Sequence, residues 1–159
     1  MAKPSRVLVD ALRRTAERVR EGAPYQWGHY GHCNCGHLAQ TLTGRTPGEI
    51  HRMATSRAGE WQDQAREFCP TSGFALADVI RDMLGVGLAI EDLVALENLH
   101  DPKVLARIPD TRRWLDRNSR DDLVLYLQTW AEILAEQLPA AAPAAPAPAP
   151  AMPLSAAPA

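Results

Sequence analysis

Apolar residues recur with the spacing of an amphipathic helix at both ends of the first 138 residues. Near the start, Leu8, Leu12 and Val19 lie on one side of a predicted helix over residues 5–21. Near the end the signal is clearest, because apolar residues follow Leu123 at i+4, i+7, i+11 and i+15. Both segments are therefore predicted to form helices that bury one face against a core.

Between these two helices, glycine and proline divide the chain into shorter helical segments. The Thr46-Pro47-Gly48-Glu49 segment is typical of a helix start, since Thr46 can cap, Pro47 suits the first helical position and Glu49 can complete a capping box. No stretch shows sustained strand alternation. We therefore expect an all-α fold, a compact helical bundle, with further helices over residues 36–43, 46–56 and 74–84 and from residue 91.

Residues 139–159 differ in composition from the rest of the chain, with 7 Pro and 11 Ala among 21 residues. Alanine is too small to build a core and proline removes backbone donors, so this tail is predicted to be disordered and extended, like polyproline. Residues 1–138 are then the single folded domain. The tail is either simply solvated or presents residues 152–155 to a protein partner.

Charge and cysteine content exclude several classes of protein. The net charge of −2 gives no electrostatic footprint for nucleic acid, and no run is long and apolar enough for a membrane span. The N-terminal residues alternate charge with Val and Leu, which is not typical of a secretory signal. Three cysteines, an odd number, argue against a disulfide-stapled secreted domain. We expect a reduced, cytoplasmic, soluble protein that binds neither nucleic acid nor membrane.

Thiol and imidazole side chains are concentrated in residues 27–37, where three glycines allow the backbone to turn tightly. Three of the five histidines and two of the three cysteines lie within nine positions of this segment: His29, His32, Cys33, Cys35 and His37. Thiolate and imidazole are the ligands that zinc and iron favour.

The third thiol, Cys69, lies in a loop interrupted by proline and glycine, and is the best candidate to complete the site. Cys33, Cys35 and Cys69 with one of the three nearby histidines would form a Cys₃His site. Zinc is the first choice of metal, and iron or an iron–sulfur cluster the second. The sequence thus predicts a metal-binding protein whose site is structural, redox-sensing or catalytic. Alternatively, the cysteines fill the core and the histidines satisfy buried carbonyls.

Two other kinds of chemistry remain open for the cysteines. Cys35 near a helix N-terminus could be a nucleophile with a neighbouring histidine as base. The segment from Cys35 to Ala39, with Gly44, resembles the nucleophile helix of the papain-like peptidases that process bacteriocin leaders. That resemblance implies a cysteine hydrolase, although the β-rich half typical of those enzymes is missing here. Thiol redox chemistry among Cys33, Cys35 and Cys69 is the other alternative.

Aromatic and acidic residues near this segment or on a predicted helix could contribute to the site. Tyr25, Trp27 and Tyr30 could form the wall of a ligand pocket, although such residues more often anchor a loop to the core. Glu60, Asp63 and Glu67 form a helical acidic stripe that could supply an oxygen ligand to iron. A solvated helix face is the simpler interpretation of the stripe.

Residues 1–138 also resemble a group of small bacterial proteins. The similarity is carried by Cys-Asn-Cys-Gly-His-Leu-Ala-Gln at residues 33–40, by Cys69-Pro70, and by Leu-Tyr-Leu-x-x-Trp-Ala at residues 125–131. The resemblance supports the extent of the domain and implies no activity.

Overall fold

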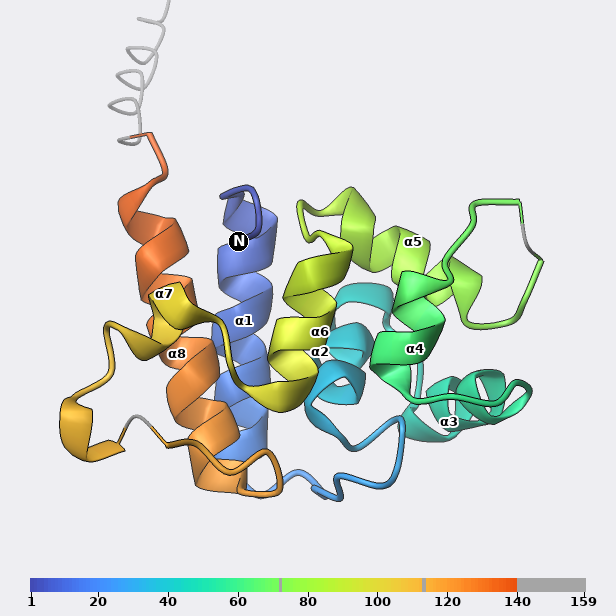
Figure 1. Ribbon diagram of the computed structural model, residues 1–159, viewed down its shortest axis with the longest axis horizontal. Helices are drawn as coiled ribbons and strands as arrows, with labels where there is room; N and C mark the ends of the chain where they lie inside the picture. Colours follow the sequence, from blue (N-terminus) through green and yellow to red (C-terminus); the bar gives the residue numbers. More distant parts are fainter. Residues whose placement is uncertain (72, 113, 140–159) are drawn as a thin grey trace, which may run out of the picture.

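The computed structural model describes residues 1–71, 73–112 and 114–139, and in this part of the chain every regular element is a helix (Figure 1). The predicted all-α fold is confirmed, whereas the predicted disordered tail lies outside the described residues. The elements are α1 (Arg6–Arg20), α2 (Asn34–Thr43), α3 (Pro47–Thr55), α4 (Trp61–Arg66), α5 (Ala77–Gly85), α6 (Ile90–Asn98), α7 (Pro102–Leu105), the 3-10 turn η1 (Asp110–Arg112) and α8 (Arg120–Glu136).

Short polar side chains set the starts of several helices. Ser5 accepts a hydrogen bond from the Leu8 N–H at the start of α1, and Ser119 accepts one from the Asp122 N–H at the start of α8. Thr46 and Glu49 form the predicted capping box at α3. These contacts satisfy backbone donors that have no partner within the helix.

The core is built around α1 and α8, which share the most extensive helix–helix contact and lie side by side (Figure 1). Leu8 and Leu12 of α1 and Leu127, Trp130 and Leu134 of α8 are buried, as their spacing predicts. On the other side of α1, the short helix α2 contacts α3, α5 and α6. Within the described residues, none of the helices has the length and apolar character needed to span a lipid bilayer.

Helix α2 begins two residues earlier than its sequence pattern predicts. Cys33 has an extended backbone, and its carbonyl accepts the hydrogen bond from the His37 N–H that opens the helix. The cysteines therefore occupy the cap and the second position of the helix. This placement decides where the two thiols point.

Two glycines allow the segment before α2 to lie directly against neighbouring backbone. A Cβ atom added to Gly36 would lie 2.1 Å from the carbonyl oxygen of Tyr30, and one added to Gly31 would lie 2.1 Å from that of Pro47. Both distances are far below van der Waals contact. The packing around α2 therefore requires glycine at positions 31 and 36, because any side chain there would overlap backbone atoms.

We expect Gly36→Ala to destabilise the protein, although alanine is favoured over glycine in a helix interior by about 1 kcal/mol. The overpacked Cβ should lower the free energy of unfolding by about 1–3 kcal/mol in urea denaturation. Gly28→Ala is the control, because a Cβ there meets no atom within 4 Å. A Gly36→Ala variant as stable as the native chain would show that the Tyr30 carbonyl does not lie against α2.

Candidate functional site

The two thiols at the start of α2 point into the protein and donate hydrogen bonds to backbone carbonyls. The Cys33 Sγ lies 3.4 Å from the Tyr30 oxygen, and the Cys35 Sγ lies 3.3 Å from the Leu93 oxygen. Both side chains are buried. Burial raises the pKa of Cys33 to about 12 and that of Cys35 well above its usual value. Both groups are thiols at neutral pH, which does not favour a nucleophilic role for Cys35.

The third thiol lies in a different environment. Cys69 is exposed in the loop after α4, with its Sγ 3.4 Å from the Thr71 hydroxyl. Among residues 1–71, 73–112 and 114–139, no group of three or more Cys, His, Asp or Glu side chains is arranged to hold a metal ion. The structure thus does not assemble the expected set of Cys33, Cys35 and Cys69 with a histidine, and metal binding stays a prediction.

Three of the five histidines, His29, His32 and His51, form a stack of rings. His29 lies between His32 and His51, with ring centroids 4.3 Å and 4.0 Å apart. The Nδ1 atom of His29 accepts a hydrogen bond from the Gly31 N–H, and that of His51 accepts one from the Tyr30 N–H. A metal-bound imidazole usually donates its second N–H instead. His29 and His51 therefore hold the loop backbone in this arrangement.

His37 is a buried residue with both ring nitrogens in use. Its Nε2 lies 3.1 Å from the Pro24 carbonyl, which can only accept, so Nε2 carries the proton. Its Nδ1 then accepts from the Arg18 guanidinium at 3.3 Å. Burial, and secondarily Arg18, lower the pKa of His37 to about 4. His37 is thus neutral and connects the loop to α1.

We expect the three thiols to react in two classes. Exposed Cys69 should be modified by 5,5′-dithiobis(2-nitrobenzoate) within seconds to minutes, whereas Cys33 and Cys35 should react only when the protein is denatured. Absorbance at 412 nm would count one fast thiol per chain, and Cys69→Ser should remove the fast phase. Rapid reaction of two or three thiols in the native protein would contradict the buried placement of the α2 cysteines.

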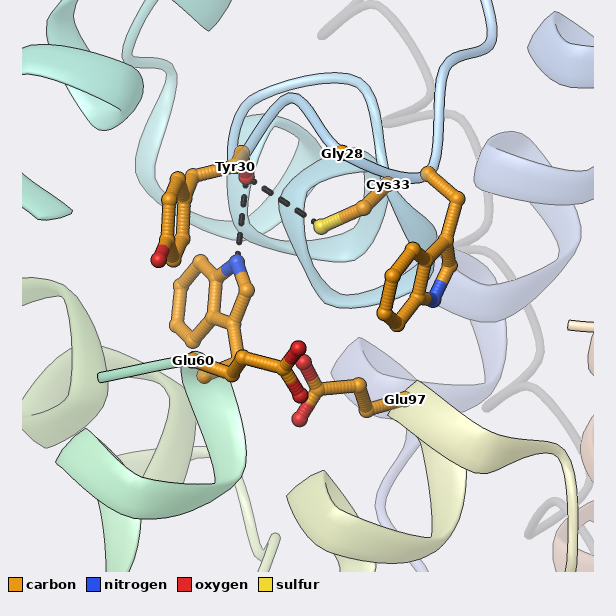
Figure 2. A pocket seen from close by; sticks show the side chains of 7 residues that line it. Gly28, Tyr30, Cys33, Glu60 and Glu97 are labelled. Atoms are coloured by element: carbon orange, nitrogen blue, oxygen red, sulfur yellow. Dashed lines mark hydrogen bonds between the residues drawn. The ribbon is translucent and has the colours of Figure 1, made fainter. Parts of the chain in front are cut away.

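A pocket opens beside the loop that carries the cysteines and histidines. Its cavity volume is about 70 Å³, and it is lined by Trp27, Gly28, Tyr30, Cys33, Glu60, Trp61 and Glu97. Figure 2 shows the carboxyl groups of Glu60 and Glu97 lying face to face, one from the start of α4 and the other from the last turn of α6. The pocket therefore brings together parts of the chain that are far apart in sequence.

Aromatic side chains form the walls of this pocket. Trp61 is buried, and its Nε1–H donates to the Tyr30 carbonyl at 3.1 Å, so that α4 is fastened to the loop (Figure 2). The guanidinium of Arg117 lies 4.0 Å from the centre of the Trp27 ring, which is cation–π geometry. Trp27 and Tyr30 are thus wall residues, as one interpretation of the sequence proposed. Tyr25 instead anchors the loop through a hydrogen bond to Asn34.

Glu97 is the unusual group of the pocket, because its side chain is ionisable and the residue is only 4% exposed. One carboxyl oxygen accepts a hydrogen bond from the Gln62 N–H at 2.6 Å. Burial raises the pKa of Glu97 to about 7, the Gln62 N–H lowers it, and the nearby charges of Glu60 and Asp63 raise it further. In the part of the chain that the structure describes, no Lys or Arg forms an ion pair with these three carboxyl groups.

The pocket takes Trp27, Gly28, Tyr30 and Cys33 from the segment that the sequence pattern singled out or from its edge, and its acidic residues from other parts of the chain. The sequence presents Glu60 and Asp63 as part of an acidic stripe, either a source of an oxygen ligand or a solvated helix face, whereas Glu97 gives no signal, since it lies in an ordinary amphipathic helix. Only tertiary packing brings Glu97 to the loop. Comparison of the chain with models of known families, with curated proteins and with solved structures finds no match. The case for a function therefore depends on the pocket itself.

The raised pKa of Glu97 makes a prediction for stability. A carboxyl group with a pKa of about 7 in the folded state and about 4.5 in the unfolded state stabilises the fold fully below pH 4.5. This contribution is lost as the pH rises through 7. Glu97→Gln removes the titration, so at pH 8 the variant should be more stable than the native chain, by up to about 3 kcal/mol.

The comparison is made by urea denaturation at pH 5 and pH 8, with Glu132→Gln, an exposed residue of α8, as the control. His37 has a lowered pKa and therefore stabilises the fold at higher pH. This contribution is the same in both proteins, so it cancels in the difference between their free energies of unfolding. If the difference in free energy of unfolding between Glu97→Gln and the native chain is the same at pH 5 and pH 8, the pKa of Glu97 is not raised by folding.

Proposed function

We propose that the protein binds a small organic cation in the pocket between the Trp27–Cys33 segment, α4 and α6. The observation that carries the proposal is the pair of facing carboxyl groups, Glu60 and Glu97, inside a cavity walled by aromatic rings (Figure 2). A concave site with aromatic walls and a few convergent polar groups is the usual form of a small-molecule site. Its charge here is negative and is not neutralised by a basic residue of the lining.

Both kinds of lining residue favour a positive ligand. Carboxylates attract a cation directly, and the attraction is stronger where the surroundings exclude water, as they do around Glu97. The faces of Trp and Tyr rings attract cations through their quadrupoles, by about 0.5–2 kcal/mol each. The Arg117 guanidinium over Trp27 is an example of this attraction within the same wall.

The size of the cavity limits the ligand. A volume of about 70 Å³ holds a few water molecules or one small charged group. A nucleotide or an aromatic cofactor does not fit inside it. The ligand is therefore a small amine, or a longer molecule of which only the charged end enters.

The proposal is tested by titrating the protein with methylammonium, 1,4-diaminobutane and tetramethylammonium chlorides, with sodium acetate and sodium chloride as controls. Trp27 and Trp61 line the pocket, so their fluorescence should change saturably on binding. Glu97→Gln should weaken binding about tenfold to a hundredfold, because a charge-assisted hydrogen bond contributes about 1.5–3 kcal/mol. Glu132→Gln should bind like the native chain.

Failure of all three cations to give a saturable signal in fluorescence and in calorimetry would reject the proposal. So would equal affinity of the native chain and the Glu97→Gln variant, because the buried carboxyl would then have no part in binding.

A further inference from the structure

If the pocket binds a cation as proposed, the position of Glu97 also indicates the chemical class of that cation. We infer that the ligand is a primary alkylammonium ion whose charged end enters the pocket and displaces the proton of Glu97. The class of ligand and the proton exchange both follow from two carboxyl groups that line one small cavity and point toward one another (Figure 2).

The first step concerns hydrogen bonds. Glu97 is almost fully buried, and a buried carboxylate needs donors for its oxygens. The Gln62 N–H supplies one at 2.6 Å, and the side-chain amide of Gln62 lies 3.3 Å from Glu60. A primary ammonium carries three N–H donors, enough to reach both carboxyl groups at once. A quaternary ammonium carries none and would add no donor to the backbone N–H groups of Gln62 and Trp61 that already face Glu97.

The second step concerns charge. Glu60, the N-cap residue of α4, and Asp63 in its first turn repel a negative charge on Glu97. Cys33, which also lines the pocket, is a neutral thiol at neutral pH. Arg117 lies over the Trp27 ring rather than beside the carboxyl groups as an ion-pair partner. The His51 ring lies 5.8 Å from the Tyr30 ring and stacks on His29, and neither histidine is among the residues that line the pocket. A cation placed between Glu60 and Glu97 would replace the repulsion by attraction.

The third step is the proton balance. The free pocket near neutral pH holds Glu97 partly as the uncharged acid, consistent with its raised pKa. An alkylammonium ion keeps its own proton, since its pKa lies near that of lysine, about 10.4. The ligand binds the carboxylate form, so the carboxyl proton leaves to the buffer. No covalent bond is made or broken in the ligand.

The experiment compares n-butylammonium with n-butyltrimethylammonium, which share the same chain and charge. Isothermal titration calorimetry at pH 6.5 in phosphate and in 2-(N-morpholino)ethanesulfonate buffer, neither of which carries a net positive charge, measures both the affinity and the protons released, because the two buffers differ in ionisation enthalpy. We expect n-butylammonium to bind about tenfold more tightly or better, as a buried acceptor left without donors is costly. Each binding event should release between half a proton and one proton.

The pH dependence provides the second measurement. The affinity for n-butylammonium should rise about tenfold between pH 6 and pH 8, as Glu97 with a pKa of about 7 becomes ionised. In Glu97→Gln, the proton release and the rise in affinity should both disappear, whereas both would persist if another group near the pocket exchanged the proton. This variant therefore separates Glu97 from His29, His32 and His51.

The outcomes are distinguishable. If n-butyltrimethylammonium binds as well as n-butylammonium, or if binding releases no proton, the inference is overturned although the pocket still binds cations. If neither ion binds, the proposed function itself fails. If proton release persists in Glu97→Gln, another group exchanges the proton and the assignment to Glu97 is wrong.

Discussion

The backbone carbonyl of Tyr30 lies where three parts of the chain meet. It accepts hydrogen bonds from the Trp61 indole of α4 and the Cys33 thiol at the start of α2. It also occupies the space that a Cβ atom at position 36 would need, so Gly36 can pack directly against it. The contact with Trp61 holds α4 against the loop, and the direct packing of α4 on α6 brings Glu60 and Trp61 beside Glu97. The pocket is therefore a consequence of how the loop packs on α2 and α4 packs on α6, rather than of any single reactive side chain.

Much of the fold could be predicted because its determinants are local. The apolar spacing of α1 and α8 and the Thr46–Glu49 capping box each depend on residues that are close in sequence. The site was harder to predict, because the function of each residue depends on where its side chain points and how deeply it is buried. Two cysteines separated by a single residue indicate metal binding as readily as core packing, and only the hydrogen bonds of the two thiols to Tyr30 and Leu93 distinguish these arrangements.

The histidines illustrate the same limit. Clustered imidazoles in a sequence indicate ligands, but which ring nitrogen carries the proton depends on partners that sequence does not give. The Pro24 carbonyl and Arg18 fix this for His37, and backbone N–H groups fix it for His29 and His51. Glu97 was missed for a related reason: it is 37 residues from Glu60 in sequence, and its burial follows from tertiary packing alone.

The proposed cation site depends on Glu97 being a buried carboxyl group that is partly uncharged at neutral pH and open to a cation. A carbon-detected NMR titration that follows the Glu97 side-chain carboxyl, assigned through the Glu97→Gln variant, tests it most directly. The proposed site predicts a titration midpoint near pH 7 in the free protein, moving to lower pH with saturating n-butylammonium. A midpoint near the ordinary glutamate value of about 4.3, unchanged by the amine, would contradict it.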